Sequence, residues 1–130
     1  MARFLGVEPR LHVHDLTRAI AFYRDMLGFR VTTVFPETTP VFAMLTRDNV
    51  CLQLGGPGGR RDAGERSTCT LYLHVHDVRD LHRKLAASIP IEWGPEVFFY
   101  GRREFAVRDV DGNLLVLSEE TTDPPTHREE

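Results

Sequence analysis

The chain has 130 residues, a formal net charge of −3 and a sequence pI of about 6.1. This weakly acidic balance excludes the basic surface of a typical nucleic-acid-binding domain. No apolar run approaches the roughly eighteen residues of a membrane span, so no membrane partner is expected. The first residues lack the long apolar core of a signal peptide, so Cys51 and Cys69 are expected to be free thiols in a reducing cytoplasm.

The first element expected in chain order is a strand over residues 7–13, where apolar and polar side chains alternate. It runs into Leu-His-Val-His-Asp at residues 11–15, and the same five residues recur at residues 73–77. Such a repeat indicates a duplicated supersecondary unit that cannot bury its apolar face alone. The function is therefore expected in a cleft between two modules.

Module 1 is expected over about residues 6–54. Asp15 is a good helix N-cap, apolar residues recur at helical spacing from Leu16 to Leu27, and Gly28 supplies the stop. A strand at residues 31–35, a loop at 36–40 and a hairpin of residues 41–46 and 50–54 complete a β-α-β-β-β order.

Module 2 is expected over about residues 68–118, after a glycine-rich linker at residues 55–67. It repeats the order of module 1. The predicted elements are a strand at residues 69–75, a helix that begins after Asp77, a short strand within residues 89–95, and a hairpin of residues 104–108 and 114–118 that turns at Asp111-Gly112. Residues 119–130 are polar and proline-bearing, which is typical of a loose tail. The sequence thus predicts one α+β domain.

Residues 15–29 read Asp-Leu-x-x-Ala-x-x-Phe-Tyr-x-x-x-Leu-Gly-Phe, which resembles the vicinal oxygen chelate superfamily of glyoxalases, extradiol dioxygenases, and fosfomycin and bleomycin resistance proteins. Residues 100–113 and Pro9 look most like the bleomycin resistance branch, although Val110 replaces a proline usual in the family. The resemblance covers roughly residues 6–118. It implies two tandem βαβββ modules that form a curved mixed sheet with a concave cleft and helices on the outer face.

Metal-using members of this superfamily carry four ligands, which the resemblance places at Glu8, Gln53, Thr70 and Val116. Glu8 and Gln53 have donor atoms that suit a divalent metal, whereas Thr70 is a poor ligand and Val116 is none. We therefore expect no metal, no other cofactor and no catalytic residue, and the protein is interpreted as a binding protein rather than an enzyme.

The histidines of the repeat are the other candidate metal ligands. His12 and His74 lie about 13 Å along from the strand starts, at roughly 3.3 Å per residue, so they are expected to be far apart if the strands diverge. His14 and His76 are interpreted as turn residues beside the helix caps. We expect His12 and His74 to line the cleft, while a two-histidine metal site on one strand stays the alternative.

Aromatic side chains with acidic neighbours suggest what the cleft binds. Rings of this kind bind planar or cationic ligands by stacking and cation–π contact. The predicted ligand-binding residues are Glu8, His12, Phe35, Phe42, Gln53, Tyr72, His74, Trp93, Phe98 and Tyr100. The opposing interpretation is that Phe98 or its neighbours only fill a core or an interface.

Two other functions stay open at this stage. One is a divergent metal-dependent lyase, isomerase or dioxygenase of the same superfamily, and the other is a purely structural or regulatory dimer. The expected partners are a small-molecule ligand and a second copy of the chain, because dimerisation closes open sheet edges.

Overall fold

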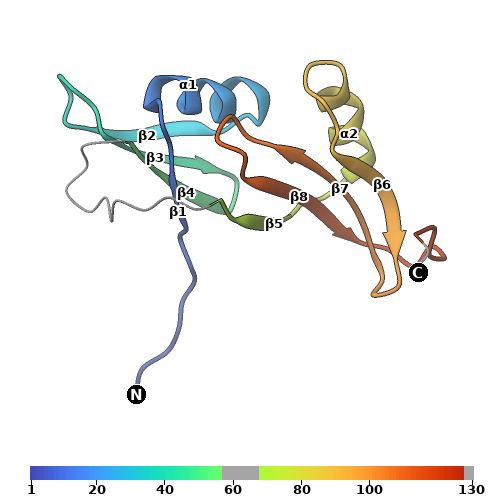
Figure 1. Cartoon of the computed structure of the whole chain (residues 1–130). Helices are drawn as coiled ribbons and strands as arrows, with labels where there is room; N and C mark the ends of the chain where they lie inside the picture. The colour runs from blue at the N-terminus through green and yellow to red at the C-terminus, as the bar shows by residue number, and fades with distance from the viewer. Residues whose placement is uncertain (57–67, 128–130) are drawn as a thin grey trace. The chain divides into compact units, whose positions relative to one another are not determined.

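The computed structural model describes residues 1–56 and 68–127. Their contacts divide into two compact units, Met1–Ser67 and Thr68–Glu130, and each unit contains one sheet of four strands. The α+β class and the repeated β-α-β-β-β order are confirmed (Figure 1). The predicted linker falls almost entirely outside the described residues.

The first unit consists of β1 (Arg10–His12), α1 (Leu16–Ala21), η1 (Phe22–Met26), β2 (Arg30–Phe35), β3 (Phe42–Arg47) and β4 (Val50–Gly55). Its strand order is β1-β4-β3-β2, with β1 parallel to β4 and the other pairs antiparallel. The predicted single helix is present but widens into the π-helical turn η1, and Gly28 ends it at a φ of 71°. Strand β1 is shorter than predicted, and residues 7–9 lie outside any strand.

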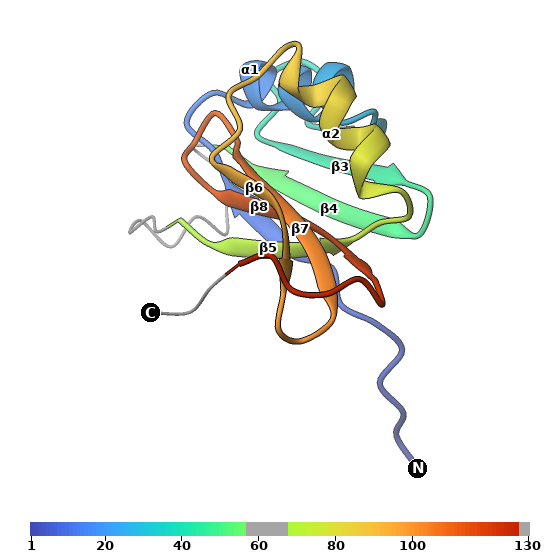
Figure 2. The same cartoon turned by 90° about the vertical axis from the view of Figure 1, so that its right-hand side faces the viewer.

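The second unit consists of β5 (Thr70–His74), α2 (Val78–Ala86), β6 (Trp93–Phe98), β7 (Arg102–Arg108) and β8 (Leu114–Glu120). Its strand order is β5-β8-β7-β6, again with one parallel pair at the first strand. Helix α2 packs on one face of this sheet against β6, β7 and β8 (Figure 2). The Asp-Gly turn lies where it was predicted, with Gly112 at a φ of 87°.

The core of each unit lies between its helix and its sheet. In the first unit Tyr23, which is fully buried, packs edge-on against Phe22 and Phe29. In the second unit the fully buried ring of Phe105 meets His82 of α2 edge-on. The side chains that point away from the helices are therefore the ones available for a site on the opposite face of each sheet.

The end of the chain differs from the sequence-based expectation. Residues 121–127 are not a loose tail but run back along β6. The backbone N–H groups of Thr126 and His127 both donate to the Val97 carbonyl, at 2.8 and 3.0 Å. The described part of the predicted tail therefore belongs to the second unit. No helix in residues 1–56 and 68–127 is long and apolar enough to cross a membrane.

Candidate functional site: an aromatic cluster beside a buried carboxylate

Glu8 and Gln53, the predicted ligand pair of the first unit, contact each other. Gln53 lies on β4 directly opposite Arg10 of β1. Its amide nitrogen donates to Glu8 Oε2 at 2.6 Å, and its amide oxygen accepts from Arg10 Nε at 3.0 Å. Both the amide nitrogen and the amide oxygen of Gln53 are thus hydrogen-bonded within the protein, and the partner of the oxygen is a cation.

Thr70 and Val116, the corresponding pair of the second unit, have no such contact. Val116 is fully buried on β8 opposite Tyr72 of β5, and its side chain has no lone pair. Among the residues that the structure describes, no group of three or more histidine, cysteine or acidic side chains is placed to hold a metal. The four positions taken together do not fit a four-ligand metal site, because one donor is missing and another already binds a guanidinium.

The two phenylalanines predicted in the first unit lie opposite each other on β2 and β3. Phe35 is exposed, with 64% of its surface accessible, whereas Phe42 is half-buried. The Arg10 guanidinium carbon lies 4.7 Å from the centre of the Phe42 ring, within the range of a cation–π contact. Phe42 therefore already has a cationic partner from its own chain.

Three aromatic residues predicted in the second unit gather on and beside β6, and we call them the aromatic cluster: Trp93, Phe98 and Tyr100. The rings of Phe98 and Tyr100 are stacked, with centroids 5.6 Å apart and planes inclined by 10°. Trp93 meets Phe98 edge-on at 5.7 Å, and a fourth ring, His127, lies 4.6 Å from Phe98. These distances lie in the range of favourable ring contacts.

A buried acid that sequence reasoning missed holds the aromatic cluster in place. Glu104 of β7 is 1% exposed and accepts hydrogen bonds from the Tyr100 hydroxyl and from Ser118 Oγ, the latter at 2.7 Å. Arg102 Nε in turn donates to Ser118 Oγ, which links a guanidinium to the carboxylate through one hydroxyl. The available signal was that each of these polar residues adjoins an apolar run, Glu104 directly before residues 105–107 and Ser118 directly after residues 114–117.

This network changes the acidity of Tyr100. Partial burial, followed by the hydrogen bond to Glu104, raises the pKa of the Tyr100 phenol far above its usual value of 10.0. The hydroxyl therefore stays protonated at physiological pH and donates its hydrogen to the carboxylate. The Glu104 carboxylate therefore lies at the hydroxyl edge of one ring of the aromatic cluster.

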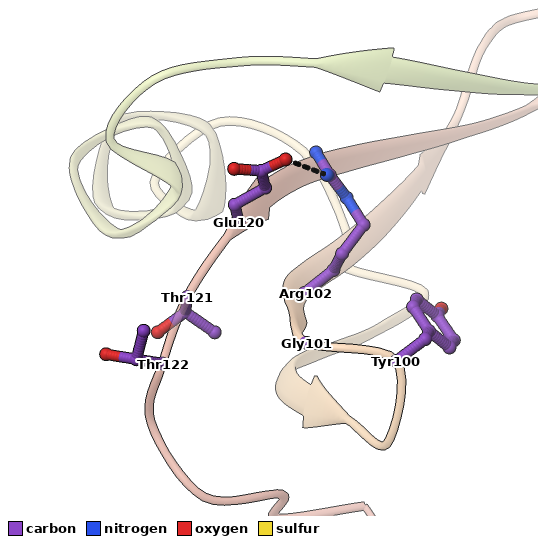
Figure 3. Close-up of a pocket in the computed structure, with 6 residues that line it drawn as sticks. All are labelled: Tyr100, Gly101, Arg102, Glu120, Thr121 and Thr122. Atoms are coloured by element: carbon purple, nitrogen blue, oxygen red, sulfur yellow. Dashed lines mark ion pairs between the residues drawn. The ribbon is translucent and has the colours of Figure 1, made fainter.

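A shallow cavity adjoins the aromatic cluster at Tyr100. It has a volume of about 670 Å³ and is lined by Tyr100, Gly101, Arg102, Glu120, Thr121 and Thr122. Figure 3 shows that these side chains come from the turn between β6 and β7 and from the end of β8, with the Arg102 guanidinium turned toward Glu120 at 3.8 Å. The cavity offers both charges and hydroxyl groups next to an aromatic face.

The remaining predicted residues lie at the sheet edges. Tyr72 and His74 are exposed on β5, and His12 is half-buried at the end of β1. His14 and His76 are exposed and come just before the residues that cap the helices, as expected of turn positions. Of the predicted ligand-binding residues, the structure brings together Glu8 with Gln53, Phe35 with Phe42, and the three members of the aromatic cluster.

Comparison with known proteins agrees with this architecture. Over residues 7–117 the chain matches the model of the Glyoxalase/Bleomycin resistance protein/Dioxygenase superfamily. No curated protein sequence matches it. Among solved structures, TioX from Micromonospora sp. ML1 superposes with a TM-score of 0.80 and 22% identity, covering 90% of this chain and 99% of that one.

Two further solved structures illustrate the range of proteins that share the fold. The lactoylglutathione lyase of Agrobacterium tumefaciens has a TM-score of 0.72 and 21% identity, covering 92% of this chain and 96% of that one. The bleomycin-binding protein of Streptomyces verticillus, solved with copper(II)-bleomycin, has a TM-score of 0.67 and 25% identity, covering 95% of this chain and all of that one. The extent of the family match establishes that the chain belongs to the glyoxalase/bleomycin resistance protein/dioxygenase superfamily.

Proposed function

We propose that this protein binds a small planar or cationic molecule on the aromatic cluster, without metal chemistry, and acts by sequestering that molecule. The observation that carries the proposal is the stacked pair of Phe98 and Tyr100, whose second ring is hydrogen-bonded to the buried carboxylate of Glu104. A ring face attracts cations through its quadrupole, and a carboxylate hydrogen-bonded to the hydroxyl at the edge of the ring adds to that attraction. The cation-binding character thus comes from two independent features.

The exposed rings of the second unit are a further reason for proposing the ligand site there. In the first unit the face of Phe42 is taken by Arg10, and the polar atoms of Gln53 are taken by Arg10 and Glu8. In the second unit Tyr72 and Tyr100 keep 56% and 47% of their surface exposed. As additional ligand contacts in the same unit we propose Tyr72 and His74, both exposed on β5. The residues predicted in the first unit, Glu8, His12, Phe35, Phe42 and Gln53, stay a sequence-based prediction.

Three probes test whether the ligand must be planar and whether it must also be cationic. Ethidium is a planar aromatic cation, phenanthridine is its uncharged planar core, and copper(II)-bleomycin is the ligand of one structural neighbour. Trp93 is the only tryptophan in the chain, so its fluorescence reports binding directly. We expect ethidium to bind more tightly than phenanthridine, because only ethidium gains the cation–π contact.

Calorimetric titration of variants then assigns the site. Trp93→Ala and Tyr100→Ala should each weaken ethidium binding by about two- to thirty-fold, the factor that corresponds to a cation–π contact of roughly 0.5–2 kcal/mol. Met26→Ala is the control, since Met26 is an apolar residue of η1 that lies exposed in the first unit. If all three probes leave the fluorescence unchanged at millimolar concentration, the proposed function is wrong.

The competing function is a divergent metal-dependent lyase, isomerase or dioxygenase. The observation in its favour is that Glu8 and Gln53 lie within hydrogen-bond distance of each other, as two ligands of one metal would. Elemental analysis of the purified protein distinguishes the two functions. Near one metal per chain, lost in Glu8→Ala and Gln53→Ala, would replace the binding proposal with the enzymatic one.

We also propose that the protein is a homodimer. Its first residues project Phe4, Leu5 and Val7 with at least 87% of each side chain exposed, which is unusual for three large apolar residues so close together. Light scattering at micromolar concentration should give about twice the chain mass of 14.9 kDa. A stable species at the mass of one chain would refute the dimer.

A further inference from the structure

Arg10 of β1 carries a guanidinium that other residues of the first unit hold in a fixed position. Its Nε donates to Gln53 Oε1 at 3.0 Å, and its guanidinium carbon lies 4.7 Å from the centre of the Phe42 ring. Gly55 leaves room for this arrangement, because a Cβ at that position would crowd Arg10 Cδ at 3.3 Å. The hydrogen bond at one edge and the ring against one face fix both the direction and the plane of the guanidinium.

This half-buried cation has no acidic side chain as its own partner. Within residues 1–56 and 68–127, which the structure describes, no carboxylate forms an ion pair with Arg10. Glu8 is linked to it through the Gln53 amide, whose nitrogen donates to the Glu8 carboxylate at 2.6 Å. Charged side chains that are removed from water are usually paired, because a counter-ion offsets the cost of dehydration. An oxyanion from outside the chain would supply this partner.

The terminal nitrogens of the Arg10 guanidinium are placed to bind such an anion. Gln53 accepts the hydrogen of Nε, which leaves the edge formed by the two terminal nitrogens for a ligand. This edge can donate two parallel hydrogen bonds to both oxygens of one carboxylate. Because Phe42 and Gln53 already fix the guanidinium, little side-chain freedom is lost when the anion binds.

An exposed apolar surface adjoins the same guanidinium. Phe35 of β2 lies directly opposite Phe42 of β3 and keeps 64% of its surface accessible. Its ring therefore lies next to the ring on which Arg10 is stacked, and an apolar group that covered it would gain free energy. The first unit thus offers a positive charge beside an apolar face.

We infer that Arg10 binds the carboxylate of a small organic acid whose apolar body lies against Phe35. The inference goes beyond the proposed function and does not depend on it, since all its residues belong to the first unit. A carboxylate is planar, like the guanidinium, and carries a single charge. A phosphate monoester carries about two negative charges at neutral pH, and Glu8, two residues before Arg10, would repel the second charge.

The test follows the binding of benzoate by NMR, with the Arg10 Nε–H and the Gln53 side-chain amide as the observed signals. Benzoate at millimolar concentration should move both signals. Benzamide, which has the same ring and a similar shape but no charge, should leave them in place. Phenyl phosphate should bind more weakly than benzoate, because of the nearby Glu8 carboxylate.

Variants then assign the binding to the guanidinium, with the Gln53 amide as the signal. Arg10→Gln should weaken benzoate binding by about tenfold or more, the factor that corresponds to a hydrogen bond with a charged group. Arg10→Lys keeps the charge but not the two parallel donors, so it should restore only part of the affinity. Arg30→Gln is the matched control, because Arg30 is an exposed arginine of β2 in the same sheet, and it should bind benzoate unchanged. Glu8→Gln removes a negative charge and should tighten binding by about two- to fivefold.

Each of four results would overturn the inference. Benzoate might move neither signal of the original protein, or benzamide might bind as tightly as benzoate, which would assign the binding to the rings alone. Equal weakening in Arg10→Gln and Arg30→Gln would show a general attraction to the sheet, and tighter binding of phenyl phosphate would replace the carboxylate with a phosphate ester. A melting temperature of Arg10→Lys close to that of the original protein excludes loss of the fold as the cause of weaker binding. The ethidium titration tests the second unit, so its failure and a failure here are distinguishable.

Discussion

Replacement of Glu104 by leucine should destabilise the protein strongly, although it removes a buried charge. The carboxylate accepts hydrogen bonds from the Tyr100 hydroxyl and from the fully buried Ser118 hydroxyl. Leucine fills a similar volume but accepts neither bond. Each orphaned donor costs about 1–3 kcal/mol, so the two together cost about 2–6 kcal/mol of unfolding free energy.

The opposing effect is the desolvation of the carboxylate, which leucine does not suffer. A buried charge costs several kcal/mol to dehydrate, and the Arg102 guanidinium is linked to Glu104 through the Ser118 hydroxyl. Removal of a single partner of such a network nevertheless leaves the other groups buried and unpaired. The cost of these unpaired groups is larger than the desolvation energy that leucine saves. Glu104→Gln should lose less unfolding free energy, about 1–2 kcal/mol, because an amide can accept a hydrogen bond from Ser118 and donate one to the phenol oxygen.

Urea unfolding followed by circular dichroism measures both changes. Glu120→Gln is the matched control, since Glu120 lies at the end of the neighbouring strand β8 with 90% of its side chain exposed. Its unfolding free energy should stay within about 0.5 kcal/mol of that of the original protein. A Glu104→Leu variant as stable as the original would refute the reasoning. It would mean that desolvation of the carboxylate outweighs the hydrogen bonds it accepts.

Two further predictions concern residues that surround Glu104. Because the pKa of Tyr100 is higher in the folded protein than in the unfolded chain, the stability that its neutral phenol contributes is complete below a pH of about 10 and declines as the pH rises further. In Tyr100→Phe this alkaline decline should be smaller, which urea unfolding between pH 8 and pH 11 measures. Gly94→Ala should be severely destabilising, because the added Cβ would lie 2.4 Å from the Glu104 carbonyl oxygen at a φ of 86°. Gly101→Ala has a similar φ of 81°, but its Cβ would lie 3.7 Å from the Thr121 carbonyl oxygen, so it should cost only about 1–2 kcal/mol. Equal losses in the two alanine variants would contradict the clash argument.

Periodicity and capping signals predicted most of the fold, because they depend on local residue patterns. Asp15 and Asp77 cap their helices with the side-chain bonds expected of them, to the N–H groups of Arg18 and Asp80. A short strand was predicted within residues 89–95, where β6 begins at Trp93. It instead continues to Phe98, because β6 is an edge strand and the register shift between Trp93 and Glu96 accommodates Gly94 and Pro95.

The candidate site was less predictable, because it depends on tertiary contacts. The aromatic members Trp93, Phe98 and Tyr100 stand close together in the sequence and could be proposed from it. One partner of Glu104, Ser118, comes from another strand, so the network could be recognised only from the pairing of β7 with β8. The contact of His127 with Phe98 joins residues 29 positions apart, and a polar, proline-bearing composition gives no sign of it.

The two identical pentapeptides show most directly what sequence leaves open. Asp15 caps α1 in an extended conformation at a φ of −135°, whereas Asp77 caps α2 in the left-handed region at a φ of 67°. The difference has a tertiary cause, since the Glu119 carboxylate accepts the N–H groups of both Asp77 and Val78, at 2.9 and 3.0 Å. The position after β4 that corresponds to Glu119 is Gly56, which has no carboxylate to offer.

The last prediction follows from this difference and uses the same substitution at both sites. Asp15→Gly loses a capping side chain, worth a few tenths of a kcal/mol against glycine, and adds about 0.5–1 kcal/mol of backbone entropy to the unfolded chain, so it should destabilise by about 1 kcal/mol. Asp77→Gly has the same two losses, but it also relieves the left-handed strain of a residue with a Cβ, which is about 1 kcal/mol or more. Its stability should therefore stay close to that of the original protein or exceed it. Urea unfolding of the two variants side by side decides the matter: an equal loss at both positions would mean that Asp77 carries no backbone strain that glycine relieves.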